Sequence, residues 1–264
     1  MIFIQNKSAP AIFIFLICLS LNNLQAQNKY NFKEFYDESK ILIERPVHWN
    51  TGDWFTTAGV LWGTYAVMHL DETIKCVVLK NRNYVTSIPM VFGKIYGEWY
   101  TQLILGTVFF VHGSVNNNSK NKKVGFEILQ SSAYVIGITG ILKFSFGRSR
   151  PYTGAGPFDF HPFSFEGDDF LSLNSGHTSL AFSLSTVLAA NIKPTGLKIL
   201  AFIPAFLTGI SRVYDNEHWA SDVFLGAFIG YFMGKFVTEL HNNNEKLFGT
   251  GQHGTPLIQF SIPF

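Results

Sequence analysis

Residues 211–222 read Ser-Arg-Val-Tyr-Asp-Asn-Glu-His-Trp-Ala-Ser-Asp and place a cation, an imidazole and a carboxylate between two apolar runs. His218 and Asp222 are four residues apart. A helix from Trp219 onward would therefore put them on one face, where the carboxylate can hold an imidazole N–H and raise the nucleophilicity of the ring. Arg212 lies six residues before His218 and can hold an anion. This group suits attack on a phosphate, because the anion must be neutralised before a nucleophile approaches it.

Two further polar clusters lie upstream, next to apolar runs. Lys143 is followed after six residues by Arg150-Pro151, and Ser175-Gly176-His177 opens a long apolar run. In this order and spacing, the three clusters resemble the signature of the type 2 phosphatidic acid phosphatase superfamily, which also contains bacterial class A acid phosphatases and vanadium haloperoxidases. The sequence departs from that signature at Asn174, where the family usually has proline. Because asparagine is a good helix N-cap, we expect the start of this helix to be kept.

The resemblance implies hydrolysis of phosphoesters in two steps, with no metal and no other cofactor. His218 would attack phosphorus and form a phosphohistidine, with Asp222 holding the opposite ring nitrogen. His177 would act as general acid and later activate the water that releases phosphate. Each residue taken singly also fits a structural role, as a capping residue or a surface charge, but their conjunction favours catalysis. The residues expected to bind phosphate are Lys143, Arg150, Ser175, Gly176 and Arg212.

The apolar runs predict an all-α fold, a helical bundle of about six core helices with the active site at one end. Residues 51–240 form this predicted domain. The charges and Pro89 between residues 74 and 98 predict a shorter helix and a connection there. The last helix carries Gly226, Gly230 and Gly234, a stripe of small residues that predicts close packing against a neighbouring helix. Long helices are expected over 52–70, 99–115, 124–142, 177–191, 196–213 and 219–237.

Both ends of the chain lie outside the predicted bundle. Residues 1–26 are predicted to be an export signal, because Lys7 precedes an apolar stretch and Ala26 is a small residue suited to cleavage. An uncleaved membrane anchor is the alternative. Residues 27–50 form a polar segment in which we expect a short helix and a turn. Residues 241–264 form a tail whose last residues alternate between apolar and polar, which predicts a short strand.

The composition favours a membrane as partner. The sequence is 47% hydrophobic and 14% charged and contains 27 phenylalanines, which is rich for a soluble protein. The formal charge of +2 comes without a basic stripe, which argues against nucleic acid. Once the signal is removed, Cys76 would be the single cysteine, so an internal disulfide and a cysteine-rich zinc site are excluded.

The predicted location is the cell envelope, on the periplasmic side, either integral to the inner membrane or associated with it. If the export signal places residue 28 outside and the segments near residues 52, 99 and 124 all span the membrane, the loop with Arg150 is cytoplasmic. Lipid phosphatases of this family, in contrast, have six helices and an outward-facing site. The conflict disappears if one segment does not span, or if none does. The lysines at 120–123 and at 193–198 lie in turns opposite the catalytic loops, which fits the positive-inside rule.

The predicted substrate is a phosphorylated lipid. An apolar bundle and a phenylalanine-rich loop over residues 151–173 favour a lipid phosphate over a small phosphate ester. Three other functions fit the same motif: a soluble periplasmic non-specific acid phosphatase, a vanadate-dependent haloperoxidase, and a phosphate-binding bundle without catalysis. The haloperoxidases that resemble this motif are much longer chains.

Overall fold

The computed structural model describes residues 29–163 and 167–247, with side chains to residue 242. It contains two compact units, Met1–His48 and Trp49–Phe264. The described residues form α-helices and short 3-10 turns with no strand, which confirms the all-α prediction. The predicted export signal and the predicted terminal strand lie outside the described residues.

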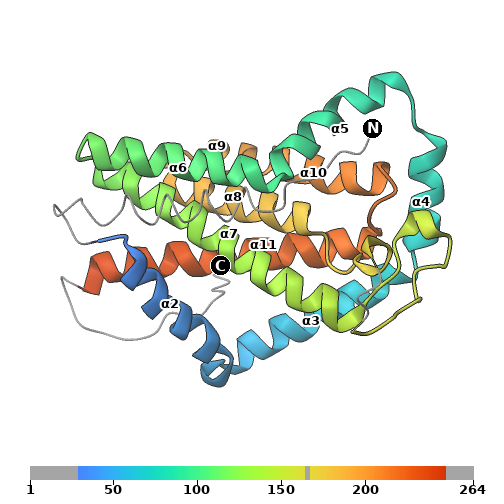
Figure 1. Ribbon diagram of the computed structural model, residues 1–264, viewed down its shortest axis with the longest axis horizontal. Coiled ribbons are helices and arrows are strands. Elements are labelled where there is room, and N and C mark those ends of the chain that lie inside the picture. Colours follow the sequence, from blue (N-terminus) through green and yellow to red (C-terminus); the bar gives the residue numbers. More distant parts are fainter. Residues whose placement is uncertain (1–28, 164–166, 248–264) are drawn as a thin grey trace, which may run out of the picture. The chain divides into compact units, whose positions relative to one another are not determined.

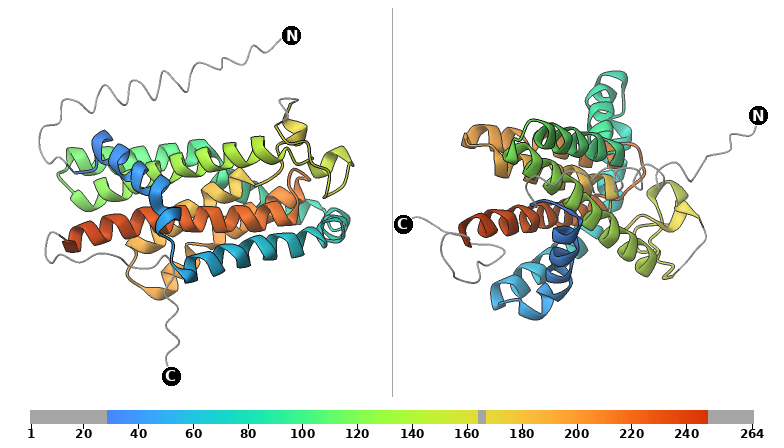
Figure 2. Two further views of the ribbon diagram at one scale, coloured as in Figure 1. Left: turned by 90° about the horizontal axis from the view of Figure 1, so that it is seen from below. Right: turned by 60° about the vertical axis from the view of Figure 1, so that its left-hand side comes forward.

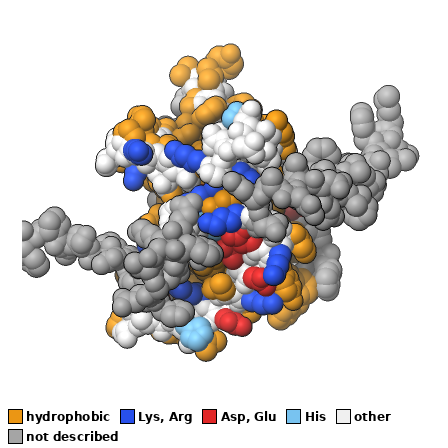
Figure 3. Space-filling view, turned by 90° about the vertical axis from the view of Figure 1, so that its left-hand side faces the viewer, with side chains coloured by type: hydrophobic (Ala, Val, Ile, Leu, Met, Phe, Trp, Pro, Cys, Tyr) orange, Lys and Arg blue, Asp and Glu red, His pale blue; other side chains and the backbone are white. Residues whose placement is uncertain are grey.

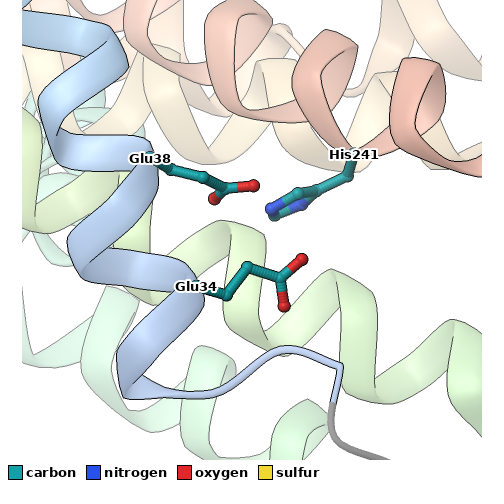
Figure 4. Close-up of side chains that lie close together, drawn as sticks. All are labelled: Glu34, Glu38 and His241. Carbon is teal, nitrogen blue, oxygen red and sulfur yellow. The ribbon is translucent and has the colours of Figure 1, made fainter. Parts of the chain in front are cut away.

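The described part of the first unit is one helix and a turn, as expected within residues 27–50. Helix α2 (Phe32–Glu44) begins after Asn31, whose side chain accepts a hydrogen bond of 3.0 Å from the Glu34 N–H. Such a cap satisfies one of the free donors of the first turn. Glu34 and Glu38 are one turn apart and project from the same side of α2 (Figure 4). A 3-10 turn, Arg45–His48, ends the unit.

The second unit is a bundle built around α7, α8 and α11, which run lengthwise beside one another (Figures 1 and 2). Helix α6 lies along α7, and α5 lies along α10. Buried apolar residues of α7 and α8, among them Ile128 and Leu184, form one core cluster. The helices are α3 (Thr51–Met68), α4 (Asp71–Lys80), α5 (Tyr84–Gly97), α6 (Trp99–Val115), α7 (Ser119–Phe146), α8 (Gly176–Asn191), α9 (Thr195–Leu200), α10 (Ile203–Tyr214) and α11 (Ala220–Leu247).

Two predicted segments differ from the structure, and local start signals explain both. The expectation of one shorter helix between residues 74 and 98 is wrong, because α4 and α5 both form there. A capping box starts α5: the Asn83 side chain accepts from the Thr86 N–H at 3.0 Å, and Thr86 accepts from the Asn83 N–H at 3.1 Å. The helix then continues through Pro89. The single helix expected over 196–213 is split into α9 and α10, and Pro204 lies in the first turn of α10, where proline favours a helix start.

The predicted stripe of glycines on α11 does pack closely against a neighbour, and the neighbour is α8. A Cβ atom added at Gly230 would lie 2.1 Å from the carbonyl oxygen of Ser179. Added at Gly226 and Gly234, it would lie 2.7 and 2.8 Å from other carbonyl oxygens of α8. The two backbones therefore approach as closely as only glycine permits, as in the small-residue contacts of membrane helices.

We expect Gly230→Ala to destabilise the bundle by about 1–3 kcal/mol, because the added methyl group meets backbone that cannot move aside alone. Thermal unfolding of the purified protein in detergent measures the effect. Gly137→Ala is the matched control, since Gly137 is a helical glycine of α7 with no neighbouring atom within 4 Å of its added Cβ. That change should stabilise by about 0.5–1 kcal/mol. Equal unfolding temperatures for the two variants would contradict the close packing.

Candidate active site

The three sequence clusters meet at one end of the bundle, in the right-hand half of Figure 1, because four helix ends lie there. Helices α7 and α10 end at this side, and α8 and α11 begin at it. Lys143 lies in the last turn of α7, His177 in the first turn of α8 and Arg212 in the last turn of α10. His218 and Asp222 stand at the start of α11, and Arg150 lies in the loop after α7.

The imidazole of His218 is buried and held by a backbone carbonyl group. Its Nδ1 lies 2.8 Å from the carbonyl oxygen of Ser172. A carbonyl oxygen can only accept, so Nδ1 carries the proton and Nε2 keeps its lone pair. Asp222 lies on the expected side of the ring, with Oδ2 at 3.8 Å from Nδ1, but the hydrogen bond goes to Ser172. Asp222 Oδ2 accepts instead from the Ser172 hydroxyl and from the Trp219 N–H at 3.0 Å.

The surroundings of His218 keep its ring neutral. Burial lowers the pKa of His218 to about 3, and the nearby Asp222 carboxylate opposes this shift only in part. Since the ring is protonated only below its pKa, His218 is neutral at pH 7. A neutral imidazole with a free Nε2 lone pair can act as a nucleophile.

A buried arginine, Arg148, holds Asp222 in place. Its Nη1 lies 2.6 Å from Asp222 Oδ1 and 2.7 Å from the Ser221 hydroxyl. Its Nη2 lies 2.8 Å from Asp71 Oδ2, and both side chains of that pair are fully buried. The backbone carbonyl of Pro157 accepts from Nε at 2.8 Å. Arg148 therefore ties α4, the loop after α7 and the start of α11 together through one guanidinium group.

Arg148 and Asp71 were not predicted from the sequence, for different reasons. Arg148 lies within the six-residue spacer between Lys143 and Arg150, and its position two residues before Arg150 was a signal that could have been used. Asp71 begins α4, far from the motifs along the chain, and only the tertiary fold brings it to Arg148.

Carboxylates hold two of the predicted phosphate-binding residues. Arg150 Nη2 lies 2.8 Å from Asp168 Oδ1, and its Nη1 lies 2.5 Å from Glu217 Oε2. The same Glu217 oxygen lies 3.9 Å from Arg212 Nη2. Glu217 therefore stands between two guanidinium groups, where an anion is favoured. The third predicted cation, Lys143, lies at the same end of the bundle, and its ammonium group donates to the carbonyl of Leu171.

Arg212 has hydrogen-bonding capacity left over. Its side chain is 5% exposed, yet among the described residues Nε and Nη1 have no hydrogen-bond partner. Buried donors are normally satisfied, so unsatisfied ones in a group of cations indicate a place for an anionic ligand. This is the feature of the described side chains that fits phosphate binding best.

The start of α8 completes the group. Ser175 is the N-cap, and its hydroxyl oxygen accepts from the Thr178 N–H at 3.4 Å. Asn174 is not the cap, because its amide donates to the Ser179 hydroxyl at 2.8 Å. Gly176 is the first helical residue, so the free N–H groups of the first turn lie beside the cations, as at many anion sites.

His177, in the same first turn, is 32% exposed and lies 3.4 Å, Nε2 to Oε2, from Glu98. Burial lowers the pKa of His177 to about 3, and Arg212, Lys143 and Arg150 lower it further by repulsion. The site thus contains two histidines: His218 is buried and His177 is partly exposed.

A helical bundle with two histidines, three cations and a helix N-terminus at one end defines a class of proteins that bind and transform phosphate groups. The family model of the PAP2 superfamily matches residues 125–246 of the chain. The family predicted from the motifs is thereby confirmed. All eight predicted site residues lie within the matched region, and Asp71 and Glu98 lie outside it.

Three known proteins illustrate the relationship. The chain is 35% identical over 101 residues to the lipid A 1-phosphatase of Porphyromonas gingivalis, a match over 38% of this chain and only 20% of that protein. It is 27% identical over 167 residues to the undecaprenyl-diphosphatase of Sulfolobus acidocaldarius, covering 62% of this chain and 76% of that one. It shares its fold with the transmembrane PAP2-type phosphatidylglycerolphosphate phosphatase of Bacillus subtilis, with a TM-score of 0.55, 20% identity, and coverage of 70% and 96%.

We expect Arg148→Met to cost about 3–5 kcal/mol of stability, because two buried carboxylates would lose their common cation. Chemical or thermal unfolding in detergent measures this cost. Arg82→Met is the control, since Arg82 is exposed and its guanidinium lies 5.0 Å from the centre of the Tyr214 ring. The variant with Asp71→Asn added to Arg148→Met should recover part of the loss, as one uncompensated charge is removed. Unchanged unfolding of Arg148→Met would contradict the proposed role of the ion pairs.

Proposed function

We propose that this protein is a metal-independent phosphatase that hydrolyses phosphate monoesters or diphosphates of lipids through a phosphohistidine intermediate. One observation carries the proposal: the buried His218 donates from Nδ1 to a carbonyl oxygen and so keeps the lone pair on Nε2. Arg212, at the same end of the bundle, has two donors, Nε and Nη1, without a hydrogen-bond partner among the described residues. A nucleophile next to prearranged positive charge is what attack on a phosphate dianion requires. The family membership of the chain supports the same chemistry.

In the first step, His218 Nε2 gives its lone pair to phosphorus, and a P–N bond forms while the bond to the leaving oxygen breaks. The bound phosphate dianion counters the repulsion of the surrounding cations and lets His177 take up a proton. His177 gives this proton to the leaving oxygen, so the leaving group departs as a neutral alcohol, or as a phosphomonoester if the substrate is a diphosphate. Lys143, Arg150 and Arg212 neutralise the phosphoryl oxygens. Asp222 lies near the ring of His218 and stabilises the positive charge that the ring gains.

In the second step, His177, now neutral, takes a proton from water. The hydroxide formed in the transition state attacks phosphorus, the P–N bond breaks, and its electron pair returns to Nε2 of His218. Inorganic phosphate leaves, and His177 has recovered the proton it gave. Ser175 and the N–H of Gly176, at the start of α8, are placed to bind phosphoryl oxygens throughout.

The exterior of the bundle supports a lipid substrate and a membrane location. Within the described residues, three segments are long and apolar enough to cross a membrane: Ser119–Phe146, Thr195–Tyr214 and Ala220–Asn242. The outer sides of α5, α6 and α10 carry large apolar side chains with half or more of their surface exposed, including Ile88, Phe92, Ile104, Val108, Phe206 and Ile210. Contiguous apolar surface of this kind needs lipid or a partner to cover it.

The interior contains many hydroxyl groups beside its apolar clusters, which also fits a membrane protein. Small hydroxyl residues are common where helices pack in a bilayer. Buried hydroxyl groups together with large apolar groups on the outside differ from the pattern of a soluble bundle. Among the buried residues of this kind on α7 and α8 are Ser131, Ser132, Ser179, Ser183, Ser185 and Thr186.

Charge at the other end of the bundle supports an orientation. The α6–α7 turn and the end of α8 lie opposite the site (Figure 1), and the exposed lysines Lys120, Lys193 and Lys198 belong to that end. Figure 3 faces this end and shows several Lys or Arg side chains on it, with Asp or Glu side chains between them. By the positive-inside rule this end is cytoplasmic. The site then lies at the outer face of the inner membrane.

The names of the three relatives give their substrates as lipid A, undecaprenyl diphosphate and phosphatidylglycerolphosphate. All three carry an apolar body and an anionic head group. We therefore propose a membrane lipid with an exposed phosphate as the substrate class.

The first prediction of this function is that His218→Ala abolishes phosphate release, lowering kcat/KM by at least about 10⁴-fold, because the lone pair that forms the P–N bond is lost. Phosphate release is measured with EDTA present from micellar phosphatidic acid, undecaprenyl diphosphate and an aryl phosphate. His112→Ala, an exposed histidine at the far end of α6, is the control. Acid-labile, alkali-stable labelling of the wild type, absent in His218→Ala, would identify the phosphohistidine.

The same assay decides the substrate class. Lipid turnover well above that of the aryl phosphate supports the lipid phosphatase. A preference for the aryl phosphate would replace it with a periplasmic acid phosphatase. Activity unchanged in His218→Ala would overturn the mechanism itself.

The second prediction concerns location. We expect the protein to stay in the membrane pellet after extraction with alkaline carbonate and to dissolve only with detergent, because apolar helices would otherwise face water. An outer-face site should hydrolyse a water-soluble aryl phosphate added to intact spheroplasts at the same rate as in lysed ones. Release by carbonate alone would exclude integral insertion, and activity that appears only after lysis would reverse the orientation.

A further inference from the structure

One carboxylate faces His177, the partly exposed histidine of the site. It belongs to a residue outside 125–246, the region that the family model matches. Glu98 stands at the junction where α5 ends and α6 begins. Its Oε2 lies 3.4 Å from Nε2 of His177, and its side chain is 18% exposed. This distance is within the range of an ion pair when the imidazole is protonated.

The backbone holds Glu98 in this place. The Glu98 N–H donates to the carbonyl of Ile95 at 3.3 Å, and the Glu98 carbonyl accepts from the Thr101 N–H at 3.1 Å. The preceding residue, Gly97, fits against the first turn of α8, where an added Cβ would lie 2.9 Å from the His177 carbonyl oxygen. The α5–α6 junction therefore rests directly on the backbone that carries His177.

The charges around His177 are otherwise positive. Lys143 from α7, Arg150 from the following loop, Arg212 from α10 and Lys94 from α5 all repel a proton on the ring, in addition to the effect of burial. A general acid must carry a proton at the moment the leaving group departs. Among the described carboxylates, Glu98 is the one within ion-pair distance of this ring.

We propose that Glu98 is a positioning residue for the general acid: its carboxylate orients His177 and stabilises the imidazolium form that protonates the leaving oxygen. The proposal rests on the proposed phosphatase function. In each cycle the proton passes from His177 to the leaving oxygen, and a proton from water replaces it. Glu98 stays ionised throughout and exchanges no proton.

This role predicts a dependence on the leaving group. An alkoxide is strongly basic and cannot leave without a proton, whereas p-nitrophenolate is weakly basic and leaves without one. Loss of Glu98 should therefore impair hydrolysis of alkyl phosphates and spare that of p-nitrophenyl phosphate. A residue that only supports the fold would affect both substrates alike.

The test compares Glu98→Gln with the wild type in detergent, using kcat/KM for a short-chain phosphatidic acid and for p-nitrophenyl phosphate. This constant covers the steps up to departure of the leaving group, so it isolates the step that needs the acid. We expect a loss of about 10- to 100-fold for the phosphatidic acid and less than about 3-fold for the aryl ester. Glu98→Asp should fall between Glu98→Gln and the wild type.

The pH profile gives a second readout. Removing the carboxylate lowers the pKa of His177 further, so a smaller fraction of the ring is protonated at any given pH. The profile of kcat/KM for the phosphatidic acid should therefore shift to lower pH in Glu98→Gln. The profile for the aryl ester should keep its position.

Two controls separate this proposal from the function on which it rests. Glu239→Gln removes a carboxylate that pairs with Lys235 on α11, and it should leave both substrates unaffected. Equal losses for both substrates in Glu98→Gln, or no loss at all, would overturn the role of Glu98 while leaving an inactive His218→Ala as support for the phosphatase. An active His218→Ala would instead remove the phosphatase mechanism.

Discussion

The buried guanidinium of Arg148 is the interaction on which the site depends most. It contacts Asp71 and Asp222 at 2.8 and 2.6 Å, and all three side chains are fully buried. Two buried carboxylates repel each other unless a cation lies between them, so none of the three can be placed without the others. Through Asp222 this arrangement reaches the start of α11, and through Asp71 it reaches α4. The position of the candidate nucleophile, His218, is therefore set by contacts between α4, the loop after α7 and the start of α11.

The candidate site residues could be singled out in the sequence because they occur in short motifs at helix ends. His218 with Asp222, His177 with Ser175, and Lys143 are each fixed relative to a helix terminus, and the packing of four helices then brings the termini together. The partners supplied by α4 and by the α5–α6 junction were not predicted. Asp71 and Glu98 stand in ordinary helical surroundings, and no local pattern distinguishes them from solvated carboxylates.

The same contrast between local and distant information explains the fold. Long apolar runs predicted α3, α6, α7, α8 and α11 to within a few residues at most ends, since periodicity and caps are local properties. The prediction failed where one residue, Pro89, was given more weight than the capping box that starts α5. Ser172 was not predicted either, because it holds His218 through its backbone carbonyl, which is the same in every amino acid. Its hydroxyl, which donates to Asp222, lies in no recognisable motif.

The contact between α8 and α11 also limits how sequences with this fold can change. Each glycine of the α11 stripe faces a backbone carbonyl oxygen of α8 or of its N-cap, in addition to side-chain atoms of α8. A protruding side chain can be shortened by a second mutation, but a peptide carbonyl cannot, so a larger residue at these three positions has no compensating partner substitution. Since α8 carries His177 and α11 follows His218, the spacing of the two histidines is protected by a feature of the backbone itself.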